Sequence, residues 1–345
     1  MTTHFTCAQP RHYAPLGIAF LFIELTVALA SAQTLESANP IQQECVALNM
    51  NSVSGQQTDA EFEVQARRML ARVGDSGEYN FCKGMTLSYL ALSLLAQDKL
   101  DGAKQAAEAS LKLLEPVIVI PAGLGGTKDG LLRQSIGVLA SAAISRNNFD
   151  EAARQAARLH PLAATEKTLA LESGLWMSIA IHRNQLNVAV QYGKETIAHW
   201  DKAGIRAVDP MENDLIDLGV ALVMSGRPTE AIPFVNRAID MSGEMRAFGA
   251  QAKANALMGF SQWQAGHGSN TADRCFKTAL YWLDQVPQQE RAQPGRQVYA
   301  TYLSYLNATG RRREAKIVRA KLDSFGADPN QWLVDYTDSR PSNHE

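Results

Sequence analysis

The chain has 345 residues and a nearly balanced charge, with 33 Lys and Arg against 35 Asp and Glu. This length is enough for one large domain or two ordinary ones, and for an extensive hydrophobic core. Without a basic excess, binding to nucleic-acid phosphates or to an anionic membrane surface is a poor expectation.

The first 32 residues have the pattern of a secretory signal peptide. A mostly apolar run over residues 16–29 is followed by Ala30-Ser31-Ala32, which fits the small-x-small cleavage rule. Glu24 inside the run and the single Arg11 before it depart from the pattern, and an uncleaved anchor or a misassigned start is the alternative. We expect cleavage near Ala32, no membrane span in the mature chain, and a periplasmic or secreted protein.

A short motif occurs six times between residues 98 and 315. An Asp, Asn or Gly is followed by an alanine five residues later, or six in one case. Residues of this kind can end a helix in the left-handed conformation, and an alanine in the next helix leaves room for close packing. The motif therefore predicts six stacked helical hairpins. The pairs are Asp98/Ala103, Asn147/Ala152, Asn184/Ala189, Gly226/Ala231, Gly266/Ala272 and Gly310/Ala315.

The best-formed unit spans Asn213 to Met241. Its first helix carries small and apolar residues on one face, Gly226 ends that helix, and Pro228 falls in the first turn of the next one. The second helix carries Ala231, Val235, Ala238 and Ile239 on its inner face. This order of small residue, turn glycine, alanine, larger apolar residue and alanine resembles a tetratricopeptide (TPR) repeat.

The resemblance implies an all-α fold, a right-handed superhelix (α-solenoid) of about six TPR-like hairpins. The successive alanines are 49, 37, 42, 41 and 43 residues apart, whereas a TPR repeats every 34. We therefore expect a stretched relative of the TPR. The expected organisation is a signal peptide at 1–32, an irregular polar segment with a short helix near Cys45 at 33–58, the solenoid at 59–325, and a C-terminal cap and disordered tail at 326–345. In that last segment Trp332, Leu333 and Tyr336 are expected to cover the last helix.

The glycine-rich stretch within Pro116–Gly130 has some parts of a phosphate-binding loop. The order is wrong for that motif, because Thr127 precedes Lys128 and Asp129 follows it. We interpret the stretch as an insertion between repeats, with a ligand-binding role left open. The histidines are scattered, and neither a catalytic nor a metal-binding constellation appears, so we expect no cofactor.

Three cysteines lie beyond the signal pattern. Cys45 and Cys82 fall on consecutive predicted helices, so a disulfide between them is plausible in an exported protein. Two buried free thiols are the alternative. Cys275 is expected to be a small core residue.

By the TPR resemblance, the first helix of each hairpin lines a concave groove. The partner-binding candidates on that face are Lys253, Phe260, Trp263, Gln297 and Asn307. Phe260 and Trp263 would form either an aromatic anchor or ordinary packing between repeats. A basic stretch, Arg311 to Arg313 with Lys316, Arg319 and Lys321, is either a solvated outer face or a docking patch for an acidic partner.

These patterns favour an exported, non-catalytic TPR-like scaffold that binds a protein or peptide in the cell envelope. The alternative is an exported enzyme acting on polysaccharide, built on a closed α/α toroid.

Overall fold

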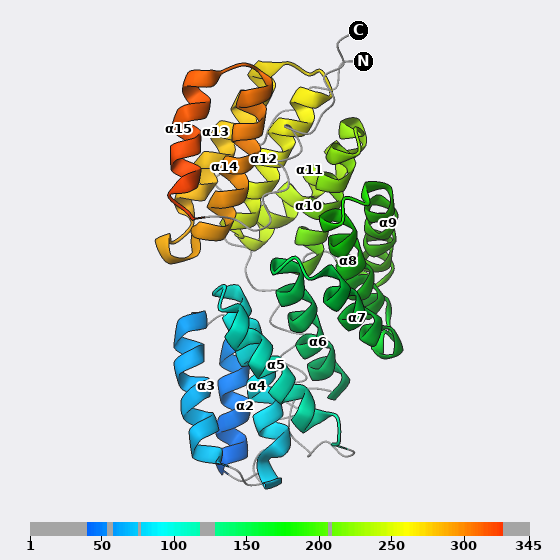
Figure 1. Ribbon diagram of the computed structural model, residues 1–345, viewed down its shortest axis with the longest axis vertical. Helices are drawn as coiled ribbons and strands as arrows, with labels where there is room; N and C mark the ends of the chain where they lie inside the picture. Colours follow the sequence, from blue (N-terminus) through cyan, green and yellow to red (C-terminus); the bar gives the residue numbers. More distant parts are fainter. Residues whose placement is uncertain (1–39, 54–57, 75–76, 118–127, 206–208, 327–345) are drawn as a thin grey trace. The chain divides into compact units, whose positions relative to one another are not determined.

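The computed structural model describes residues 40–53, 58–74, 77–117, 128–205 and 209–326, and within these ranges the regular structure is helical, without strands (Figure 1). Fourteen α-helices, α2 to α15, are described, and the predicted all-α helical solenoid is confirmed for them. The predicted signal peptide, most of the glycine-rich stretch and the aromatic C-terminal segment lie outside the described residues.

The chain divides into two compact units, with the boundary at residues 162 and 163. The N-terminal unit contains the helices α2 (Pro40–Val53), α3 (Asp59–Val73), α4 (Asn80–Ala96), α5 (Leu100–Leu114), α6 (Lys128–Ser145) and α7 (Phe149–Leu159). Within it, α4 packs on α5 and α6 packs on α7, as two of the predicted hairpins.

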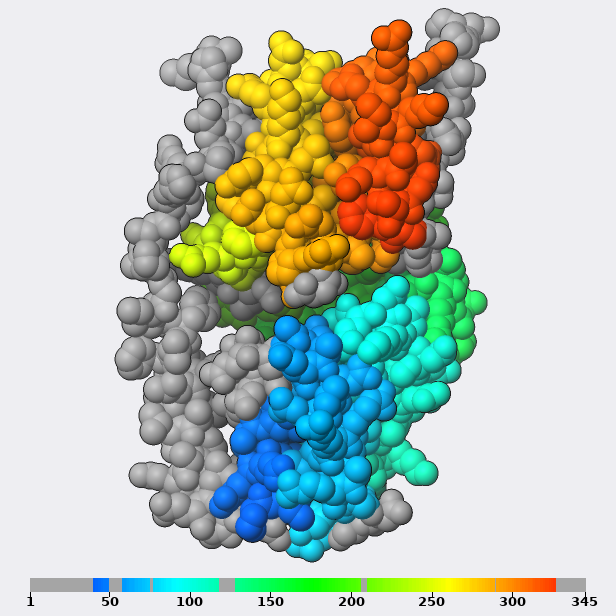
Figure 2. All heavy atoms as spheres, turned by 90° about the vertical axis from the view of Figure 1, so that its left-hand side faces the viewer, coloured from blue at the N-terminus to red at the C-terminus, as the bar shows by residue number. Residues whose placement is uncertain are grey.

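The C-terminal unit contains the other four hairpins. Their helices are α8 (Glu166–His182), α9 (Leu186–Lys202), α10 (Asp209–Met224), α11 (Pro228–Met245), α12 (Phe248–Gln264), α13 (Ser269–Gln285), α14 (Ala292–Ala308) and α15 (Arg312–Asp323). The first helix of each hairpin also contacts the first helix of the next, from α8 to α10, α12 and α14. One buried apolar cluster runs through the whole unit, and α15 lies at its surface beside α14 (Figure 2).

The turn motif is confirmed at all six positions. Each predicted turn residue has a positive φ, between 56° and 82°, and each paired alanine is buried. At Gly226 the amide donates to the Val223 carbonyl at 3.1 Å, and the next amide, of Arg227, donates to the Leu222 carbonyl at 2.8 Å. These two bonds satisfy helix-end carbonyls in a Schellman motif. Left-handed turn residues therefore end the first helix of every hairpin.

Close packing explains the small residue in the middle of the first helix. A Cβ atom on Gly219 of α10 would lie 2.7 Å from Val235 Cγ2 in α11 and 3.0 Å from Leu257 Cδ2 in α12. Ala231 and Ala238, on the facing side of α11, are fully buried. These small residues let α10 approach both neighbours, as the TPR resemblance implies.

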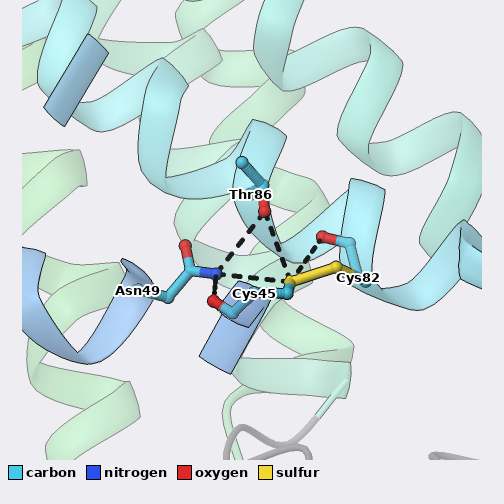
Figure 3. Close-up of a disulfide and its surroundings, with 4 residues drawn as sticks. All are labelled: Cys45, Asn49, Cys82 and Thr86. Atoms are coloured by element: carbon cyan, nitrogen blue, oxygen red, sulfur yellow. Dashed lines mark hydrogen bonds between the residues drawn. A yellow bond between two sulfur atoms is a disulfide. The ribbon is translucent and has the colours of Figure 1, made fainter. Parts of the chain in front are cut away.

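The segment before the first predicted repeat contains the helix that was expected near Cys45. This helix is α2, of 14 residues, within the stretch 33–58. In the structure, a disulfide joins Cys45 of α2 to Cys82 of α4, with the two Cα atoms 6.2 Å apart (Figure 3). The Asn49 amide, also in α2, donates to the Cys45 carbonyl at 2.7 Å. This helix has little amphipathic pattern in its sequence, so the cross-link and the burial of a few residues hold it in place.

Candidate functional site

Three ionisable side chains gather on neighbouring first helices of the C-terminal unit. Asp214 and Asp217 lie three residues apart on α10, and Lys253 lies on α12; all three are half-buried. The Lys253 ammonium donates to Asn213 Oδ1 at 2.9 Å, which bridges the two helices. We call Asp214, Asp217 and Lys253 the charged cluster. The same two helices also bury other polar side chains, Glu212 on α10 and Gln251 and Asn255 on α12.

Asp214 is held between two other helices. The buried indole of Trp200, near the end of α9, donates from Nε1 to Asp214 Oδ2 at 2.7 Å. On α8, a Cβ atom on Gly174 would lie 2.6 Å from Asp214 Oδ1, so only glycine lets the carboxyl approach this closely. Burial raises the pKa of Asp214 to about 8; the Trp200 hydrogen bond opposes this rise, and the nearby Asp217 charge adds to it. At neutral pH this carboxyl is therefore mostly protonated.

Asp217 and Lys253 influence each other. Burial raises the pKa of Asp217, opposed by the positive charge of Lys253 and by His182. Burial lowers the pKa of Lys253, opposed by Asp217 and by Glu212. Each group favours the charged form of the other, while the surrounding protein disfavours both charges. The pair thus offers one acceptor and one donor in partly desolvated surroundings, where charge-assisted hydrogen bonds are stronger than at a fully exposed site.

The predicted groove residues differ in how far they are exposed to solvent. Lys253 belongs to the charged cluster, Gln297 is half-buried on α14, and Asn307 is exposed near the end of that helix. Trp263 is half-buried. Phe260 is fully buried, so its predicted role as a partner-binding residue is wrong. The reason is that α12 packs against α10, α11, α13 and α14, which leaves few of its side chains uncovered.

An aromatic cluster accounts for the burial of Phe260. Its ring lies 5.5 Å from that of Trp263, and Trp263 meets Tyr305 of α14 edge-on at 5.8 Å. Phe276 of α13 stacks on both Tyr302 and Tyr305, at 4.6 and 5.0 Å. The two aromatics on α12 therefore take part in packing between hairpins, as the second interpretation of the sequence held.

The residues of the basic stretch near the C-terminal end differ in their contacts. Arg311 forms salt bridges with Asp273 of α13 and with Glu314, and its guanidinium lies 5.6 Å from the Tyr305 ring centre. Arg311 thus ties the last hairpin to the preceding one. In contrast, Arg312, Lys316 and Arg319 line an open depression together with Leu303, Asn307 and Ala315.

Lys128 has a structural role in the described part of its loop. Its ammonium donates to the carbonyls of Glu115 and Val117, at 2.7 and 2.6 Å, and so binds the chain that leaves α5. Among the described residues, no group of three His, Cys, Asp or Glu side chains is placed to hold a metal ion. No helix among them is both long and apolar enough to span a membrane.

The two acidic members of the charged cluster, Asp214 and Asp217, were not among the predicted site residues. Asp214 and Asp217 are embedded among Leu215, Ile216 and Leu218. Two carboxylates three residues apart on a predominantly apolar helix are an unusual use of a buried face. That pattern could have identified Asp214 and Asp217 as candidates from the sequence. Gly174 on α8 and Trp200 on α9 come from distant parts of the chain and had no signal of their own, whereas Lys253 on α12 was already a partner-binding candidate.

Hairpin order, left-handed turns and small-residue contacts together define an all-α protein with a TPR-like helical-repeat fold. No protein-family model matches the chain, and no curated protein matches it. Among solved structures, the apo form of RapI is similar with a TM-score of 0.54 and 13% identity, over 77% of this chain and 92% of that one. A Rap protein complexed with competence and sporulation factor is similar with a TM-score of 0.54 and 12% identity, over 90% of this chain and 79% of that one. At these identities the similarity shows the fold alone.

Proposed function

We propose that this protein is a non-catalytic TPR-like scaffold that binds a peptide or an extended protein segment on the first helices of its C-terminal unit. The observation that carries the proposal is the charged cluster, because Asp217 and Lys253 remain half-buried on adjacent helices α10 and α12. Nothing in the described residues favours the polysaccharide-degrading alternative. The similar Rap protein was solved with competence and sporulation factor bound, which supports a ligand-binding role for this kind of fold.

The chemistry of the cluster suits a peptide. A peptide offers N–H and C=O groups along its backbone, and Asp217 and Lys253 provide an acceptor and a donor that match them. Half-buried groups of this kind gain more from a ligand than exposed ones, because less water competes for them. Gln297, half-buried on α14, would add an amide donor and acceptor to the same run of helices.

A random peptide library displayed on phage and selected on the full chain tests this function. We expect the selected peptides to bind Asp217→Asn and Lys253→Met variants at least ~10-fold more weakly, a loss of about 1.4 kcal/mol. The matched control is Lys277→Met, which removes an exposed lysine from α13. Enrichment of no peptide, or equal affinity for the wild type and the two folded cluster variants, would overturn the proposal.

We further propose that the protein is exported and works in the cell envelope or outside the cell. Two observations support this location: the signal-peptide pattern of residues 1–32 and the disulfide between Cys45 and Cys82, since disulfides persist mainly in oxidising compartments. Mass spectrometry of the protein isolated from its own cells provides the test. The expected species begins at Gln33 and carries the cross-link. An intact chain in the cytoplasm with both cysteines as thiols would contradict export.

A further inference from the structure

The surface at the end of the last described hairpin is open and basic. The depression between α14 and α15 has Leu303 and Ala315 as its apolar floor and Asn307, Arg312, Lys316 and Arg319 around it. We call these six residues the basic depression. Figure 2 shows α15, in red-orange, on the face turned to the viewer. The surface carries three positive charges within about two helical turns.

These three charges lack an acidic counterpart in the part of the chain that the structure describes. Arg312, Lys316 and Arg319 make no salt bridge there, whereas the adjacent Arg311 makes two. Their spacing of four and three residues places them on one side of α15, where like charges repel one another. A carboxylate-bearing segment in the basic depression would relieve that repulsion.

The fifth hairpin shows which side chains pack at the place that corresponds to the basic depression of the sixth. When the turn glycines Gly266 and Gly310 are matched, Trp263 corresponds to Asn307; when Ala272 and Ala315 are matched, Phe276 corresponds to Arg319. In the fifth hairpin, Trp263 contacts Tyr305, and Phe276 contacts both Tyr302 and Tyr305. The two tyrosines belong to α14, the next helix of the chain. The basic depression is thus the place where a segment following the sixth hairpin would pack, with polar and basic groups in place of aromatic ones.

The segment that follows has complementary chemistry. Residues 327–345, which lie outside the described residues, carry four carboxylate side chains against one arginine. Three of the acids, Asp328, Asp335 and Asp338, flank the apolar group of Trp332, Leu333 and Tyr336. Since α15 has 12 residues, it is about 18 Å long. A chain extends by at most ~3.3–3.6 Å per residue, so Asp335, nine residues after Gly326, can reach any part of the helix.

We propose that the basic depression is an intramolecular docking site for the chain's own C-terminal segment. The carboxylates of Asp335 and Asp338 meet Arg312, Lys316 and Arg319, and Trp332 covers the floor at Leu303 and Ala315. The segment then takes the place of a seventh hairpin and covers Asn307. This inference concerns a surface on α14 and α15 and does not depend on the charged cluster.

The fluorescence of Trp332 in the full-length protein tests the docking. Subtracting the spectrum of a Trp332→Phe variant from that of the wild type isolates the emission of this residue. We expect that emission to lie at shorter wavelength than that of free N-acetyl-tryptophanamide and to be poorly quenched by acrylamide. In an Arg312→Glu/Arg319→Glu background, the Trp332 emission should move to the wavelength of free N-acetyl-tryptophanamide and be quenched by acrylamide as strongly as that compound. The matched control is Arg274→Glu/Lys277→Glu, which makes the same charge change at exposed positions of α13 and should leave the emission unshifted.

The outcomes separate the alternatives. The proposal would be overturned if Trp332 in the wild type emits at the wavelength of free N-acetyl-tryptophanamide. It would also be overturned if the charge reversal on α15 leaves the emission unchanged in a protein with unchanged circular dichroism. A shift that grows with protein concentration would mean that the occupant is a second copy, which would also overturn it. If the double variant fails to fold, Arg319→Gln provides the milder test. Restoration of the short-wavelength emission by combining Arg319→Glu with Asp335→Lys would support direct pairing of the two residues.

Discussion

Asp214→Asn should stabilise this protein increasingly as the pH rises. The asparagine amide has nearly the shape of a protonated carboxyl, and its Oδ1 can still accept the 2.7 Å hydrogen bond that Trp200 donates to Asp214. It fits the same space beside Gly174. The substitution therefore retains the packing and removes the need to hold or release a proton at this position.

The magnitude follows from the pKa of Asp214, which burial raises from 3.8 to about 8. Between these values the folded protein holds a proton that the unfolded chain has released, so the free energy of unfolding falls as pH rises. The slope is about 1.4 kcal/mol per pH unit, which amounts to about 2.7 kcal/mol between about pH 5 and about pH 7. The contribution is complete below 3.8 and is lost as pH rises through about 8. The asparagine variant lacks this slope.

Urea unfolding of the two proteins across this pH range measures the effect. The difference in free energy of unfolding, variant minus wild type, isolates Asp214 because other titrating groups cancel to first order. We expect it to increase steadily with pH and to level off above about pH 8. Asp240→Asn, at an exposed site on α11, is the control for a general charge effect. A difference that does not change with pH, or that decreases, would refute the reasoning about this buried carboxyl.

Three further predictions concern packing. Replacing both Cys45 and Cys82 with alanine removes a cross-link over 37 residues. The free energy of unfolding, measured in urea against the oxidised wild type, should fall by ~3–4 kcal/mol in the chain-entropy model. An unchanged free energy of unfolding would mean that burial alone holds α2 in place. Ala231→Leu should overpack the contact between α10 and α11 and cost ~1–3 kcal/mol, and an unaltered melting temperature would show that the site has spare room. Trp263→Ala opens the aromatic cluster between α12 and α14 and should cost ~3 kcal/mol, so a stable variant with impaired peptide binding would instead identify Trp263 as a surface anchor.

How the chain folds locally could be predicted from its sequence. The six turn residues and the buried alanines that follow them can be recognised from the sequence alone, because a left-handed backbone and close helix contact each restrict the residue type at one position. The small residue at Gly219 follows the same logic. Such requirements act over a few residues, so they appear directly in the sequence pattern.

Which side chains remain accessible could not be predicted in the same way. Phe260 was expected in the groove and is buried, because α14 places Tyr305 next to Trp263 and closes that part of α12. Asp214 acquires its high pKa only when Trp200 of α9 and Gly174 of α8 enclose it. By itself, the sequence determined the hairpins and their turns, since those depend on local backbone geometry. Only the tertiary structure decided where the half-buried charges lie, because burial and desolvation depend on helices that are distant in the chain.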